Sequence, residues 1–374
     1  PRNVGLHLFG SNVSAVVDLP TSLDSLVSRI PPGMGLSVET LIRKNTLFPL
    51  FAPFLPTERA AQVVQGMASD KALSVRLSVG LLASDVPLPQ YLRYCPQCVA
   101  EDRARYGDSY WHLSHQPPGV LLCPTHFVPL VDAVRIRDPR PRHSFLPLEE
   151  TAEQGPAIGD EERLPLQDVA IGCKWLLEWG QLQGPGLAWI RDRYRDILRQ
   201  KGWVTDGGYC RNATIRQNFL QYCPRTLLTR LGCPLAAETY DWVTRMTRHP
   251  KGAFHPLMHL LMLGSLGVSP VEFFRPWAPG RAGGTPTKNI ACPQTWRSEG
   301  VLDEKSPSAG SSNGGSAFTL GSRTGRHARR LEEEAWDRNR QIWLACQAAH
   351  PGASRMDLRR AIPSVARWLH RHDR

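Results

Sequence analysis

The stretch Cys95-Pro96-Gln97-Cys98 and, after 24 intervening residues, the stretch Cys123-Pro124-Thr125-His126 decide how the middle of this chain folds. Each stretch places two soft ligands on one tight turn, and two such turns can close a tetrahedron around a zinc ion. Thiolates combined with an imidazole favour zinc over magnesium or calcium. The sequence therefore predicts one structural zinc ion held by Cys95, Cys98, Cys123 and His126. With four protein ligands, the site leaves no position for a catalytic water.

Four other histidines lie in settings that could bind a metal. His112 and His115 lie between the two cysteine stretches, but neither belongs to a paired turn, so we expect them to form hydrogen bonds. His255 and His259 have the i, i+4 spacing of ligands on a helix. No acidic or thiol residue is close to them in sequence, so we expect core or surface positions instead.

No catalytic motif accompanies the cysteine cluster. The chain has no Walker A motif, no G-x-S-x-G and no H-E-x-x-H. Acidic pairs such as Glu101-Asp102 and Glu161-Glu162 are interpreted as loop-like or solvated. We therefore expect a binding protein and not an enzyme.

Charge is distributed unevenly along the 374 residues, which carry a net charge of +11. Residues 1–200 contain 20 Lys/Arg and 21 Asp/Glu, whereas residues 201–374 contain 25 and 13, a net charge of +12. A neutral half joined to a basic half indicates an acidic polymer as the partner of the second half. Only seven of the 45 basic residues are lysines. Arginine suits bidentate contacts with phosphate and guanine, although a GC-rich genome would also raise its share.

Periodicity and capping signals predict a mainly α fold. The expected organisation is an N-terminal helical domain of helix-turn-helix type (1–90) with an inserted zinc ribbon (91–134), a linker (135–165), a helical domain with a possible helix-turn-helix (166–278), a flexible Gly/Ser-rich linker (279–325) and a C-terminal helix-turn-helix (326–374). We expect Ser37 to cap one early helix and Thr57 to open another. Later helices are expected over 166–179, 187–201, 212–221, 224–231, 240–248, 255–266 and 331–349.

Location is predicted from absent signals. No run of 18 uncharged apolar residues exists, no signal peptide is visible, and the nine cysteines are odd in number and mostly scattered. These features favour a reducing cytoplasm, with association to the nucleoid, and no membrane partner. The chain begins at Pro1 and ends within a predicted basic helix, so we expect trimmed ends.

A long signature surrounds the cysteine cluster. It comprises Tyr91-Leu92-Arg93-Tyr94-Cys95-Pro96-Gln97-Cys98, Asp102, Gly107, Tyr110-Trp111-His112, His115-Gln116, Pro118-Gly119-Val120 and Cys123-Pro124-Thr125-His126. This signature resembles the TniQ/TnsD family, whose members select target sites for cut-and-paste transposons that use an AAA+ ATPase regulator. The segment 255–261 and the tail 358–374 resemble the longer TnsD branch. Leu113 and Pro117 depart from the pattern, and the single Cys292 makes a second ribbon doubtful.

The resemblance implies that the protein recognises an attachment site in double-stranded DNA and recruits a TnsC-like AAA+ regulator, with other transposase subunits as further candidate partners. One alternative is an adaptor of the shorter TniQ type, which docks on an RNA-guided CRISPR complex and reads no DNA; the basic tail argues against it. A second is a zinc-dependent hydrolase or nuclease, against which the closed site and the missing carboxylate cluster argue.

Two basic regions are candidates for DNA contact. In the first, four arginines flank two short predicted helices, although an ordinary helical surface explains them nearly as well: Arg211, Arg216, Arg225 and Arg230. In the tail, a short helix is followed by a turn at Pro363 and a second helix, which matches a recognition helix in a major groove. A solvated basic helix end is the alternative. The tail candidates are Arg355, Arg359, Arg360, Arg367, His370 and Arg371, of which we expect Arg367 and Arg371 to read bases.

Overall fold

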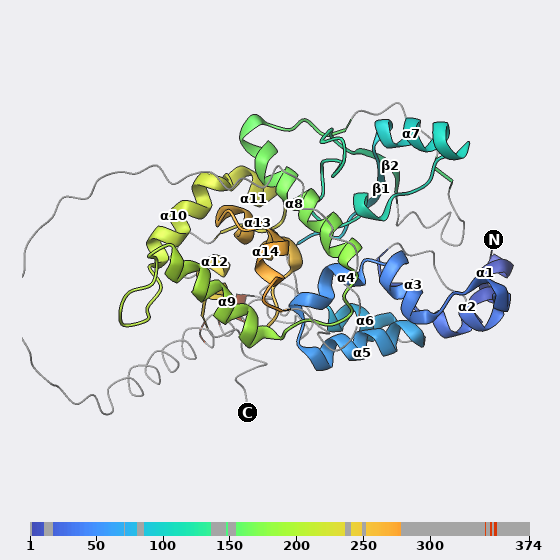
Figure 1. Ribbon diagram of the computed structural model, residues 1–374, viewed down its shortest axis with the longest axis horizontal. Helices are drawn as coiled ribbons and strands as arrows, with labels where there is room; N and C mark the ends of the chain where they lie inside the picture. The colour runs from blue at the N-terminus through green and yellow to red at the C-terminus, as the bar shows by residue number, and fades with distance from the viewer. Residues whose placement is uncertain are drawn as a thin grey trace, which may run out of the picture. The chain divides into compact units, whose positions relative to one another are not determined.

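The computed structural model describes residues 2–10, 18–70, 72–80, 86–135, 147–148, 155–235, 241–248 and 252–277, and Gln341, Ala345, Ala348 and Ala349. The chain divides into two units, Pro1–Gly300 and Val301–Arg374, and each is considered by itself. Within the described residues the structure is mainly helical, which confirms the predicted fold class (Figure 1).

The N-terminal part consists of short helices, because prolines and polar caps interrupt the chain every ten to fifteen residues. Ser37 caps α3 as expected: its hydroxyl accepts a hydrogen bond from the Thr40 N–H at 3.1 Å. α5 opens at Thr57, also as expected. The elements are α1 (Arg2–Phe9), α2 (Leu23–Arg29), η1 (Pro32–Met34), α3 (Val38–Asn45), α4 (Phe48–Phe51), η2 (Ala52–Phe54), α5 (Thr57–Ala68) and α6 (Ala72–Ser78).

The predicted zinc ribbon contains two short strands. β1 (Tyr91–Tyr94) pairs antiparallel with β2 (Val131–Arg135), and the register shifts between Leu92 and Arg93. Directly after β1 the chain enters α7 (Pro96–Tyr106), and a 3-10 turn, η3 (Leu113–His115), follows. Figure 1 shows α7 beside the two strands, at one side of the long helix α8.

Seven helices follow. α8 begins at Asp160 rather than near Leu166, because three acidic residues in its first turn suit the positive end of the helix and Glu162 caps the Gly159 N–H at 3.4 Å. The pair Glu161-Glu162 therefore belongs to a helix and not to a loop. The helices are α8 (Asp160–Trp179), α9 (Leu187–Gln200), α10 (Asn212–Tyr222), α11 (Arg225–Arg230), α12 (Trp242–Met246), α13 (Pro256–Ser265) and α14 (Pro270–Phe274).

One hydrophobic core joins these parts, with buried members from Leu19 to Phe274. α8 packs against α4 and α13. A Cβ added at Gly172 of α8 would lie 2.7 Å from Leu260 of α13, and one at Gly119 of the ribbon would lie 2.7 Å from Leu257. The ribbon and the helices before and after it therefore share their interior.

No helix in the described part of the chain is long and apolar enough to cross a bilayer. In the expected helix 331–349, the four described residues are helical. The tail residues Arg355, Arg359, Arg360, Arg367, His370 and Arg371 lie outside the described residues, so their DNA contacts stay a prediction.

Candidate metal centre

The first cysteine pair lies at the start of a helix. Cys95 occupies the N-cap position of α7 in extended conformation, and Pro96 takes the first helical position, where its missing N–H costs nothing. Cys98 follows within the first helical turn. This step from strand to helix brings both sulfur atoms to one side of the chain.

The second pair lies in a tight hairpin turn. The Cys123 N–H donates to Val128 O and the Phe127 N–H to Cys123 O, both at 2.9 Å, and Phe127 has a positive φ of 56°. The N–H groups of Thr125 and His126 each lie 3.4 Å from Cys123 Sγ. The turn therefore presents the sulfur together with two backbone donors that stabilise its negative charge.

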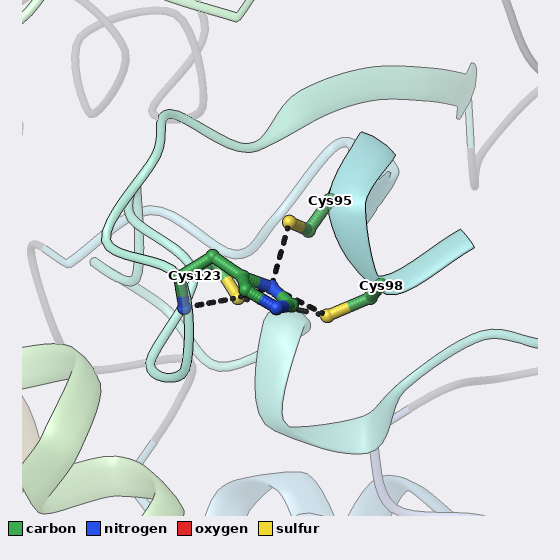
Figure 2. Close-up of side chains that lie close together, drawn as sticks. Cys95, Cys98 and Cys123 are labelled. Carbon is green, nitrogen blue, oxygen red and sulfur yellow. Dashed lines mark hydrogen bonds between the residues drawn. The ribbon is translucent and has the colours of Figure 1, made fainter. Parts of the chain in front are cut away.

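The four predicted ligands converge, with their ligand atoms all within 4.8 Å of one another. His126 Nδ1 lies 3.5 Å from Cys95 Sγ, 3.3 Å from Cys98 Sγ and 3.6 Å from Cys123 Sγ, and the Cys98 and Cys123 sulfurs are 3.7 Å apart. Tetrahedral zinc requires sulfurs about 3.8 Å apart and S···N separations of about 3.5 Å. The cluster fits a metal ion of this kind without rearrangement. Figure 2 shows the three labelled cysteines around the imidazole ring.

The thiol cluster is electrostatically prepared for a cation. Hydrogen bonds from Cys95 and then from Cys98 lower the pKa of the Cys123 thiol, which makes it the first of the three to ionise. A positive metal ion would stabilise the other two thiolates in the same way.

A carboxylate orients the histidine ligand. His126 Nε2 lies 2.9 Å from Glu101 Oε1, which leaves Nδ1 facing the sulfurs. Such an outer carboxylate fixes the ring and raises its basicity. Glu101 was expected to be loop-like or solvated, but it lies on α7, three residues after Cys98. That i, i+3 spacing on a helix is the signal that would have found it.

The two rival histidines form hydrogen bonds, as expected. His115 Nε2 lies 3.8 Å from Cys98 Sγ and 3.6 Å from Cys123 Sγ. His112 Nε2 lies 2.7 Å from Asp102 Oδ2, and its ring stacks on His115 at 4.9 Å. Cys98, His112 and His115 also form a second group with ligand atoms close together, but it shares Cys98 with the first group. Burial lowers the pKa of His115, so its neutral ring can donate one N–H to the thiolates.

The other candidate DNA residues differ in their surroundings. Arg211 and Arg225 are exposed, at the N-cap of α10 and the first position of α11. Arg216 instead pairs with Asp241 at 2.8 Å, and Arg230 pairs with Glu162 at 2.8 Å. All four belong to the helices around which they were predicted.

His255 and His259 lie in the core. The ring of His259 stacks on Phe54 at 4.2 Å, and its Nδ1 accepts a hydrogen bond from the Tyr194 hydroxyl at 3.1 Å. His255 Nδ1 accepts from the Leu257 N–H at 3.2 Å and so caps α13. Burial lowers the pKa of both histidines to about 3. Neither belongs to a metal-binding group of three or more among the described residues.

Two family models match the chain. The TniQ model matches residues 2–130, and the model for Tn7-like transposition protein D matches residues 169–298. The chain is also 34% identical over 274 residues to the transposition protein TnsD of transposon Tn7 from Escherichia coli, an alignment that covers 71% of this chain and 52% of that protein. The chain thus spans about half the length of this curated relative. The first model ends just after the metal cluster, and the second begins within α8.

Proposed function

We propose that this chain, which belongs to the TniQ/TnsD family, selects the target of a transposon by binding one defined site in double-stranded DNA and recruiting a TnsC-like AAA+ ATPase. The observation that carries the proposal is the identity to TnsD over 71% of the chain, which runs through both the metal cluster and the later helices. Other transposase subunits are further candidate partners, and the proposed location is the bacterial nucleoid.

DNA binding is assigned to the second half of the chain. That half has a net charge of +12, and its exposed arginines include Arg211 and Arg225. Charge of this kind releases counterions when it meets the phosphate backbone. We assign base recognition to Arg367 and Arg371 and phosphate contacts to Arg355 and Arg359, because the second helix of this motif enters the groove. The neutral first half is the proposed contact for the ATPase.

The metal we propose is a single structural zinc ion. Cys95, Cys98, Cys123 and His126 supply four ligands at tetrahedral separations, so a bound zinc would hold β1, α7 and the hairpin turn together. Zinc in a site with four protein ligands has no open position for substrate or water. The protein would therefore act by binding, not by metal-assisted hydrolysis.

Selection from a randomised duplex library, with the full chain and no guide RNA, tests this function. One recurring motif is expected, and a TnsC-like ATPase should be retained on that duplex only when the chain is present. Failure to enrich any motif, together with binding to a guide-RNA complex, would favour the adaptor of the shorter TniQ type. Cleavage of the duplex by the zinc-loaded chain would favour the nuclease.

A further inference from the structure

The segment between α9 and α10 forms a rigid hairpin. Val204 and Cys210 form an antiparallel bridge, and the Gly208 N–H donates to Thr205 O at 2.8 Å across the turn. Gly208 has a φ of +77°, which a side chain would disfavour. The Arg195 guanidinium donates to Gly208 O at 2.6 Å and fastens the tip to α9. Figure 1 shows this hairpin extending beyond the helices that it joins.

The two sides of the hairpin differ. Trp203, Val204 and Cys210 are partly buried and pack against the core. Tyr209 points the other way and is 77% exposed, more than any other exposed large hydrophobic residue in the described part of the chain. A fixed backbone that presents a bare aromatic ring spends none of that ring on folding, which is typical of a contact surface.

The surroundings of Tyr209 are basic. Residues 191–216 contain seven Lys/Arg and three Asp, and two of these aspartates pair with Arg191 and Arg199. Arg211 is exposed at the hairpin base, at the N-cap of α10, whose first turn holds no acidic residue. The positive end of that helix adds to the potential of the arginine. This charge fits an anionic polymer.

We propose that the hairpin 203–211 is a wing that contacts the phosphate backbone of double-stranded DNA, with the Tyr209 hydroxyl donating to one phosphate and Arg211 neutralising another. This inference rests on the proposed function and adds a second DNA-contacting element to the tail. The contact is independent of sequence, because phosphates are the same at every base pair. The neighbouring Lys201, whose ammonium lies 5.6 Å from the Trp203 ring centre, extends the basic edge.

The test measures binding of the full chain to a fluorescein-labelled duplex of random sequence and to the selected motif, between about 50 and about 200 mM salt. Tyr209→Phe and Tyr209→Ala should each weaken both duplexes about tenfold, because each removes a hydrogen bond to a charged group. Arg211→Ala should lower the salt slope by roughly 1. Tyr106→Ala is the matched control, since Tyr106 is a 59% exposed tyrosine on α7.

Equal binding by the Tyr209, Arg211 and Tyr106 variants, with wild-type chain bound normally, would overturn the wing and leave the proposed function intact. Loss of ATPase recruitment without any loss of DNA affinity would assign the hairpin to protein contact instead, which also overturns it. Absence of duplex binding by the wild-type chain would refute the proposed function itself. Unchanged thermal melting and zinc content must accompany the variants, as expected for exposed side chains.

Discussion

Gln116 completes the hydrogen bonding of Arg93 in place of a neighbouring strand. Its side-chain oxygen accepts from the Arg93 N–H at 3.1 Å, and its side-chain N–H donates to Arg93 O at 2.8 Å. The guanidinium of Arg93 reaches back across the same loop and donates to Val120 O and, at 2.9 Å, to Pro117 O. Both side chains are buried. This reciprocal pair fixes the metal-binding loop to β1.

Gln116→Ala should therefore destabilise the fold around the metal. The change leaves the buried N–H and C=O of Arg93 without partners, at a cost of about 3 kcal/mol in the free energy of unfolding. Urea unfolding measures this, and Gln97→Ala is the control because Gln97 is exposed on α7. Equal stability of the two variants would show that the pair does not hold the loop.

The histidine that binds the metal can be identified by substitution. We expect about one zinc per wild-type chain by elemental analysis, and loss of the zinc with loosening of the fold in Cys95→Ser and His126→Ala. His115→Phe should keep the zinc but release it to a chelator about tenfold faster, because an N–H donor to two thiolates is lost. Retention of zinc by His126→Ala and its loss in His115→Phe would make His115 the fourth ligand.

Acid should destabilise the protein through the buried histidines. The pKa of His255 and of His259 falls to about 3 in the folded chain, so the unfolded chain binds protons that the folded one does not. Their contribution is complete above pH 6.5 and is lost as the pH falls toward 3, by about 2 kcal/mol for each histidine at pH 5.

His255→Asn isolates one of these contributions. Asparagine can still accept from the Leu257 N–H and cap α13, but it does not titrate. Unfolding free energies at pH 7 and pH 5 should differ by about 2 kcal/mol less in the variant than in the wild type. Protonation of the metal ligands affects both proteins equally and cancels in this comparison. An identical pH dependence would exclude His255 as a source of acid sensitivity.

The arginines of the helices α10 and α11 should separate into two classes. Arg211→Ala and Arg225→Ala should each reduce the salt slope of DNA binding by roughly 1 without changing the melting temperature. Arg216→Ala should instead cost about 3 kcal/mol of stability, because Asp241, with a side chain 1% exposed, loses its cation. Binding and melting curves of the three variants check this; a uniform loss of DNA affinity with no loss of stability would contradict it.

The metal cluster and most helices could be predicted from the sequence because their signals are local. The spacing of Cys95 and Cys98 defines a ligand pair, and Ser37 marks a helix start within four residues. Two helices were missed for different reasons. At α7, a cysteine turn with proline at its first position continues as a helix. At α14, the pair Ser269 and Glu272 forms a capping box, a readable signal that was overlooked.

The remaining features depend on contacts between distant residues. Gln116 reaches Arg93 across 23 residues, and Gly172 of α8 faces Leu260 of α13. No periodicity or spacing specifies such pairs, because they arise when separately predicted elements pack. For the same reason, the pairing of Arg216 with Asp241 could not be foreseen, and the sequence treated all four arginines alike.

Competition between duplexes tests the central claim most directly. The full, zinc-loaded chain is titrated at physiological salt and without guide RNA against its native attachment-site duplex and a random duplex of equal length. Sequence-specific target selection predicts that the attachment site binds at least about 10³-fold more tightly. Equal affinity for the two duplexes would contradict the account and leave recognition of the target to another component.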